Sequence, residues 1–91
     1  MAKILIVEDD PFIRNVYQKI LEKDNHQVTT ASDGQVGLDV VEEFQPDLII
    51  LDMLMPVVDG IQFLERYNLK ENHPNVKVIV LSNMMMQDKI N

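Results

Sequence analysis

Short apolar runs, each followed at once by polar residues, dominate the hydrophobic pattern of the chain. Residues 4–7, 48–51 and 76–81 form runs that are nearly continuous in aliphatic and β-branched side chains. A run of this length without polar alternation is typical of a parallel strand that helices cover on both faces. Residues 27–31 are more polar, so we expect them to form a strand at the edge of the sheet.

Between these runs, apolar residues recur at the spacing of amphipathic helices. The first helix is predicted to begin with Asp10 as N-cap and Pro11 in its first turn, and to end near residue 23. Further helices are predicted from residue 34 to about residue 44, from residue 59 or 60, and within residues 84–90. The apolar positions expected to face the sheet are Ile13, Val16, Tyr17, Ile20 and Leu21 in the first helix, Gly37, Val40, Val41 and Phe44 in the second, and Phe63, Leu64 and Tyr67 in the third.

The alternation of strands and helices predicts an α/β fold with a doubly wound parallel sheet and right-handed crossovers. If the polar strand of residues 27–31 lies outside, the first and third strands must be neighbours, and the strand order is 2-1-3-4. The chain then reverses its direction across the sheet between the first and third strands. Ligands of such sheets bind at this switch point, beyond the carboxyl ends of the strands.

The chain has 91 residues, no cysteine and a formal net charge of -7, from 15 acidic and 8 basic residues. This length predicts one domain spanning residues 1–91. The negative charge argues against direct binding of nucleic acid, which requires a basic surface. We recognise neither a signal peptide nor a membrane-length apolar segment, so we expect a cytoplasmic protein without a membrane partner.

Acidic side chains follow two strands that the predicted order places side by side. Glu8 and Asp9 come directly after the first strand, and Asp52 follows the third. Carboxylates that converge in this way suit a hard divalent cation, and we expect Mg²⁺. Ser82 follows the fourth strand, where its hydroxyl could donate to a phosphoryl group. The sequence therefore predicts a phosphoryl-transfer site in which Asp52 is the nucleophile and forms an acyl phosphate.

Four motifs in this order and spacing resemble the receiver domain of bacterial two-component response regulators, over essentially the whole chain. The resemblance implies a flavodoxin-like fold and a phosphoacceptor module that receives its phosphoryl group from a sensor histidine kinase or a phosphotransfer protein. It implies a switch rather than an enzyme. The segments that carry the resemblance are residues 4–10, 33–34, 46–60 and 78–82.

Site roles follow from the same resemblance, residue by residue. It makes Asp52 the phosphoacceptor, and Glu8 and Asp9 the acidic pair that binds Mg²⁺ with Asp52. The backbone carbonyl of Leu54 completes the metal site, and Ser82 is the switch hydroxyl that follows the phosphoryl group.

The resemblance also implies a further strand with a lysine that pairs with the phosphoryl group, and a final helix. Neither Lys77, within the fourth strand, nor Lys89, in the last helical segment, matches that lysine. We therefore expect an incomplete receiver domain, in which the last strand and helix are missing. An apolar fourth strand at the edge of the sheet then predicts self-association.

Three alternative functions stay open beside the signalling module. A phosphohydrolase with an aspartyl nucleophile usually has an acid two residues later, but that position is Leu54. A receiver fragment without signalling activity could self-associate through its fourth strand and the uncovered face of the sheet. A flavin-binding sheet is the weakest alternative, because the loop after the first strand is acidic where a phosphate cradle is needed.

Overall fold

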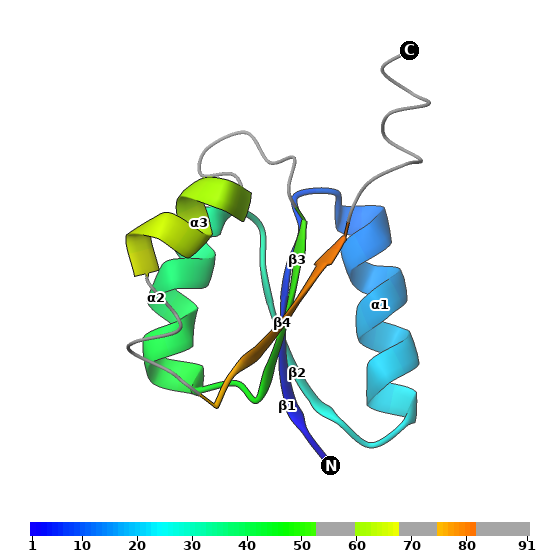
Figure 1. The fold of residues 1–91 in the computed structure, drawn as a ribbon. Coiled ribbons are helices and arrows are strands. Elements are labelled where there is room, and N and C mark those ends of the chain that lie inside the picture. The colour runs from blue at the N-terminus through cyan, green and yellow to red at the C-terminus, as the bar shows by residue number, and fades with distance from the viewer. Residues whose placement is uncertain (53–59, 68–74, 82–91) are drawn as a thin grey trace.

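The computed structural model describes residues 1–52, 60–67 and 75–81, and strands and helices alternate through these ranges (Figure 1). The described elements are β1 (Lys3–Val7), α1 (Pro11–Lys23), β2 (Gln27–Ala31), α2 (Gly34–Phe44), β3 (Leu48–Asp52), α3 (Gly60–Tyr67) and β4 (Lys77–Leu81). The predicted helix within residues 84–90 lies outside the described residues. None of the described helices has the length and apolar character that crossing a bilayer requires.

The four described strands form one parallel sheet in the order β2-β1-β3-β4, which confirms the predicted order. The register pairs Val7 of β1 with Leu51 of β3, so the two strands end at the same edge of the sheet. Helix α1 covers one face, and α2 and α3 cover the other (Figure 1). The residues that follow β1 and those that end β3 are therefore neighbours in space.

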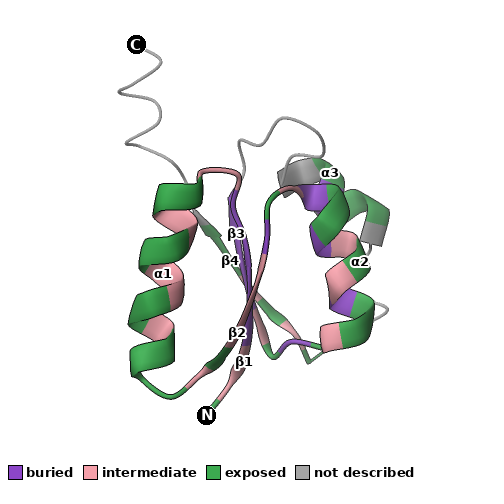
Figure 2. Cartoon of the chain, turned by 180° about the vertical axis from the view of Figure 1, so that it is seen from behind, coloured by how far each residue is buried: buried purple, intermediate pink, exposed green. Residues whose placement is uncertain are grey.

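Buried residues are concentrated in the central strands β1 and β3 (Figure 2). Alternate residues of these strands belong to two apolar clusters, one on each face of the sheet, because successive side chains of a strand point to opposite faces. The cluster beneath α1 consists of Ile4, Ile6 and Ile50, and the cluster beneath α2 and α3 consists of Leu5, Val7, Ala31, Val41, Ile49, Leu51 and Phe63.

Helix α1 packs on the sheet through a narrower face than its apolar pattern predicts. Tyr17 and Leu21 contact the cluster beneath the helix. Val16 and Ile20, which were expected to face the sheet, are 40% and 55% exposed and continue the line of Phe12, which is 75% exposed. The apolar positions span a wider arc of the helix than the sheet covers, so the prediction that Val16 and Ile20 face the sheet is wrong.

The ends of the first two helices are fixed by local hydrogen bonds. Asp10 caps α1, as predicted, because its carboxylate accepts from the amides of Phe12 and Ile13 at 2.9 and 3.3 Å. Asp33 caps α2 through the amide of Val36, at 2.9 Å. The first cap sets where α1 begins and hence the length of the loop between β1 and α1, residues 8–10, which carries two of the predicted site residues.

Helix α2 approaches β1 closely at Gly37. A Cβ atom at this position would lie 3.0 Å from Val7 Cγ2 and 3.1 Å from Phe63 Cε2. Only a residue without a side chain fits this approach without a shift of its neighbours. The close contact of α2 with the last residue of β1 supports the strand end from which Glu8 emerges.

Candidate metal centre

Three carboxylates meet where β1 and β3 end. Glu8 and Asp9 follow β1, and Asp52 is the last residue of β3. One ligand oxygen from each of these side chains lies within 4.8 Å of the others. The structure thus brings together the three acids that the sequence predicted. Asp52 still belongs to β3, not to the loop after it, because its backbone remains in register with Leu81 of β4.

Two of the three acids are removed from solvent. Glu8 is 2% exposed and Asp52 is completely buried. The amide of Glu8 donates to the carbonyl of Ala31 on β2 at 3.0 Å, which holds the start of the loop against the sheet. A buried carboxylate is costly unless a proton or a cation offsets its charge.

The pKa of Glu8 is raised from about 4.5 to about 8. Burial of the carboxyl group is the largest cause, followed by hydrogen bonds to the side chains of Asp52 and Asp9, and repulsion from Asp52 adds to them. The amide of Asp10, which donates to Glu8 Oε2 at 3.3 Å, acts in the opposite direction. Without a cation, the cluster therefore holds a proton at neutral pH.

The donor set fits a hard divalent cation such as Mg²⁺. All three groups offer carboxylate oxygens, which Mg²⁺ prefers over nitrogen or sulfur ligands. Asp9 Oδ1 is buried and has no hydrogen-bond partner among the described residues. An oxygen in that state is stabilised by a cation, which would also remove the repulsion that raises the pKa of Glu8.

Arg14 of α1 reaches back to the same loop. Its Nη1 atom donates to the backbone carbonyl of Glu8 at 2.9 Å. Sequence reasoning did not single out this residue. The only signal was weak: a cation this close to the beginning of a helix gains nothing from the helix dipole.

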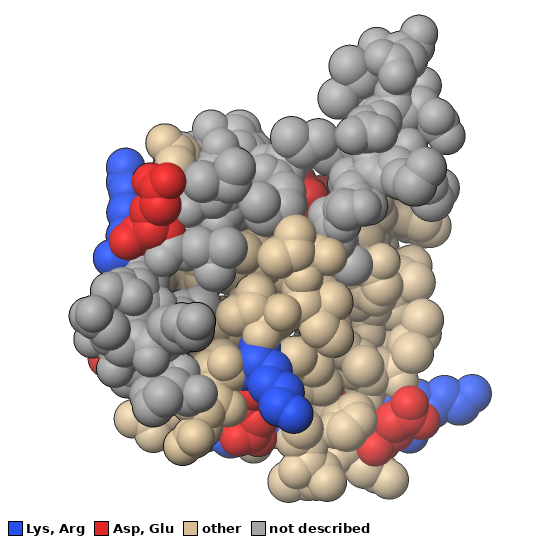
Figure 3. Space-filling view, viewed as in Figure 1, with Lys and Arg blue, Asp and Glu red and all other residues tan. Residues whose placement is uncertain are grey.

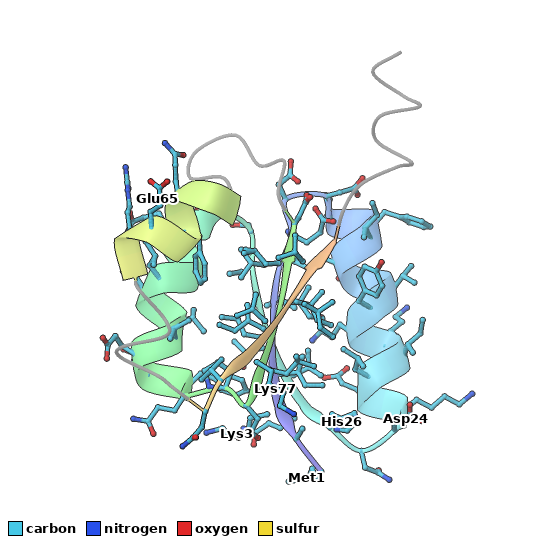
Figure 4. All side chains as sticks on the ribbon, in the orientation of Figure 1. Met1, Lys3, Asp24, His26, Glu65 and Lys77 are labelled. Carbon is cyan, nitrogen blue, oxygen red and sulfur yellow. The ribbon has the colours of Figure 1, made fainter. Side chains whose placement is uncertain are left out.

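Two predicted site residues, Leu54 and Ser82, lie outside the described residues, so their roles stay predictions. The two lysines that begin β1 and β4, Lys3 and Lys77, lie at the opposite end of the sheet from the acids (Figure 4). Neither lysine can therefore neutralise the three carboxylates. The position of Lys77 agrees with the expectation that it does not pair with a phosphoryl group at Asp52.

The chain is similar to known proteins in both sequence and fold. The family described as "Response regulator receiver domain" matches residues 4–91. The chain is 39% identical over 80 residues to sporulation initiation phosphotransferase F of Bacillus subtilis, covering 88% of this chain and 63% of that protein. It is 31% identical over 91 residues to the chemotaxis protein CheY of Halobacterium salinarum, covering 99% of this chain and 74% of that protein.

The fold is similar to that of the chemotaxis protein CheY4 of Vibrio cholerae, with a TM-score of 0.81 and 28% identity over 99% of this chain and 78% of that chain. The chain spans a smaller part of some relatives, for example 38% of a DNA-binding transcriptional regulator of Synechocystis that is 37% identical over 91 residues. The sheet order and the acidic cluster agree with the family match over residues 4–91. The chain therefore belongs to the response regulator receiver domain family.

Proposed function

We propose that this chain takes a phosphoryl group onto Asp52 in a Mg²⁺-dependent reaction, from a phosphohistidine of a sensor kinase or phosphotransfer protein. One observation carries the proposal: Glu8, Asp9 and Asp52 converge within 4.8 Å at the switch point of a receiver fold. An acid that ends a central strand, beside two further acids, has the surroundings of an activated carboxylate nucleophile.

In the transfer step, a carboxylate oxygen of Asp52 attacks the phosphorus atom of the phosphohistidine. A P–O bond forms and the P–N bond breaks, so the imidazole of the donor leaves with the electron pair and takes up a proton. The product is an acyl phosphate on Asp52, which water later hydrolyses. Because the group ends on the chain itself, we propose a switch rather than an enzyme.

Mg²⁺, held by Glu8, Asp9 and Asp52, would supply positive charge at the phosphoryl oxygens during transfer. From the family resemblance, we also propose the backbone carbonyl of Leu54 as a metal ligand and the hydroxyl of Ser82 as a contact of the phosphoryl group. The chain's own contribution is to hold three carboxylates together in a site with little access to water, where electrostatic interactions are strong.

The test is the intact mass of the chain after incubation with a small acyl phosphate donor, with and without Mg²⁺. We expect the mass of one phosphoryl group to be added, and only when Mg²⁺ is present. A folded chain that gains no mass under any Mg²⁺ concentration would contradict the proposal.

An apolar stripe on α1 supports a protein as the phosphoryl donor. The stripe consists of Phe12, Val16 and Ile20, which are 75%, 40% and 55% exposed. It begins three residues after Asp9, so a partner seated on it lies beside the acids. Exposed aromatic side chains of this kind are typical anchors of protein interfaces.

Phe12→Ala is expected to slow transfer from a phosphorylated sensor kinase about tenfold or more, because truncating a central aromatic anchor usually costs at least about 2 kcal/mol. A panel of purified sensor kinases is first screened for one that phosphorylates the wild-type chain. The rate of transfer from that kinase is then followed with radiolabelled phosphate. Labelling by the small acyl phosphate should be unchanged. Val36→Ala, at an exposed apolar position of α2, is the matched control. Equal loss with both donors would contradict a docking role.

Self-association through β4 is the second candidate property. Ile79 and Val80 of this strand are 50% and 40% exposed, and β4 lies at one edge of the described sheet. The described surface over β4 is largely uncharged apart from Lys77, the exposed residue that begins the strand (Figure 3). Exposed apolar edges of sheets favour pairing with a second copy.

Ile79→Lys is expected to abolish a concentration-dependent rise in mass that the wild-type chain shows in sedimentation experiments, because a charge on an edge strand opposes pairing. Val36→Lys, which places the same charge on a helix, should leave the rise in place. A wild-type chain that stays monomeric at every concentration would exclude this candidate.

A further inference from the structure

We propose that Arg14 is a positioning residue of the acidic site, which holds the loop of residues 8–10 so that Glu8 and Asp9 face Asp52. The inference rests on the proposed function, because the positions of these acids matter for the metal ion they would bind. Arg14 is not itself a ligand. Its guanidinium donates a hydrogen bond to the backbone carbonyl of Glu8.

The Glu8 carbonyl is the point at which Arg14 acts. β1 ends at Val7, so the carbonyl of Glu8 lies beyond the strand, while the Glu8 amide still donates to Ala31 at 3.0 Å. Arg14 Nη1 supplies the donor for this carbonyl at 2.9 Å. A backbone carbonyl at a strand end needs such a partner when water is largely excluded. The two bonds together hold the two peptide groups that flank the Cα atom of Glu8.

The next residues of the loop are held from the same helix. The Arg14 amide donates to the carbonyl of Asp10 at 2.9 Å, as the first turn of α1 requires. The Asp10 carboxylate caps this turn through the amides of Phe12 and Ile13. Arg14 therefore joins the beginning of α1 to Glu8, and Asp9 lies between these two fixed points.

Helix stability does not explain a cation at this position. The beginning of a helix carries partial positive charge and favours acids over bases. Lys19 and Lys23 of the same helix are exposed and lie further from its beginning. Arg14 is instead half-buried and directed at the loop that carries the acids.

Charge and positioning predict opposite effects on Mg²⁺ binding, which makes the inference testable. A positive side chain near the site repels Mg²⁺, so loss of its charge alone should strengthen binding. Loss of the hydrogen bond to Glu8 should weaken binding, because groups that orient metal ligands typically contribute about 10- to 100-fold to affinity. The sign of the change therefore distinguishes the two effects.

The experiment is calorimetric titration of the full 91-residue chain with MgCl₂, for the wild type, Arg14→Met, Arg14→Lys and Lys19→Met. Arg14→Met should weaken Mg²⁺ binding about tenfold, at the lower end of the range for groups that orient ligands. Arg14→Lys retains a donor and a charge, and should recover most of the loss. Lys19→Met makes the same change of net charge on the same helix, and should bind Mg²⁺ as tightly as the wild type or slightly more tightly.

A second readout separates positioning from damage to the fold. The Mg²⁺ concentration that gives half-maximal labelling by a small acyl phosphate should rise about tenfold in Arg14→Met, in step with its affinity, while the rate at saturating Mg²⁺ stays near that of the wild type. A variant that is merely unstable would lose amplitude without this shift.

Two results would overturn the inference. Unchanged or tighter Mg²⁺ binding by folded Arg14→Met would remove the positioning role and leave the proposed metal site intact. Absence of Mg²⁺ binding by the wild-type chain would overturn both the metal site and the role of Arg14.

Discussion

Asp52→Asn is expected to reduce phosphoryl incorporation from a small acyl phosphate by about 1000-fold or more, because the chain then lacks its carboxylate nucleophile. An amide oxygen is far less nucleophilic than a carboxylate oxygen, and its phosphoryl adduct would not be stable. The measurement is the intact mass of the protein, with peptide mapping after reduction by borohydride to locate the acyl phosphate.

The structure offers controls for this prediction. Asp39→Asn makes the same chemical change at an exposed position of α2 and should be labelled like the wild-type chain. Asp9→Asn should slow labelling at low Mg²⁺ concentration, since Asp9 is a proposed ligand and not the nucleophile. Full labelling of Asp52→Asn would contradict the assignment and would direct the search for a nucleophile to Asp9, which is the least buried acid of the cluster.

The strand order and the acidic cluster could be predicted from the sequence because both depend on local patterns. The polar strand β2 belongs at an edge, and this places β1 beside β3. Once those strands are neighbours, acids at or just after their carboxyl ends come close together at the same edge of the sheet. Glu8, Asp9 and Asp52 are therefore found by pattern alone.

Three features could not be predicted because they depend on distances across the fold. The apolar pattern of α1 indicates a side of the helix but not the width of the contact, so the exposure of Val16 and Ile20 was missed. The hydrogen bond between Arg14 and the carbonyl of Glu8 joins residues six positions apart, and it depends on how the loop turns between strand and helix. The raised pKa of Glu8 likewise follows from burial and from the approach of Asp52.

Glu8→Gln is expected to stabilise the metal-free chain at about pH 8 by about 2 to 4 kcal/mol, because it removes the need to bury a charge or bind a proton there. The folded chain raises the pKa of Glu8 from 4.5 to about 8, so the folded state retains a proton that the unfolded state has released. The contribution of Glu8 to the free energy of unfolding is greatest below about pH 4.5. It falls as the pH rises toward 8, by up to about 1.4 kcal/mol per pH unit.

The measurement is urea unfolding at a series of pH values with a chelator present. The wild-type chain should lose stability over this range relative to Glu8→Gln, whereas the exposed Glu22→Gln should follow the wild type. A Glu8→Gln chain with the same pH dependence as the wild type would show that Glu8 does not hold the proton.

With Mg²⁺ present the order of stability should reverse, which connects this prediction to function. The cation must displace the proton of Glu8, so the wild-type chain should bind Mg²⁺ about tenfold more tightly for each pH unit up to about pH 8. Glu8→Gln lacks this ligand charge and should gain little stability from Mg²⁺ at any pH. The three carboxylates would then destabilise the fold without Mg²⁺ and stabilise it with Mg²⁺ bound. Such a cluster is arranged to bind the ion and not to stabilise the fold. Equal stabilisation of both chains by Mg²⁺ would exclude Glu8 from the metal site.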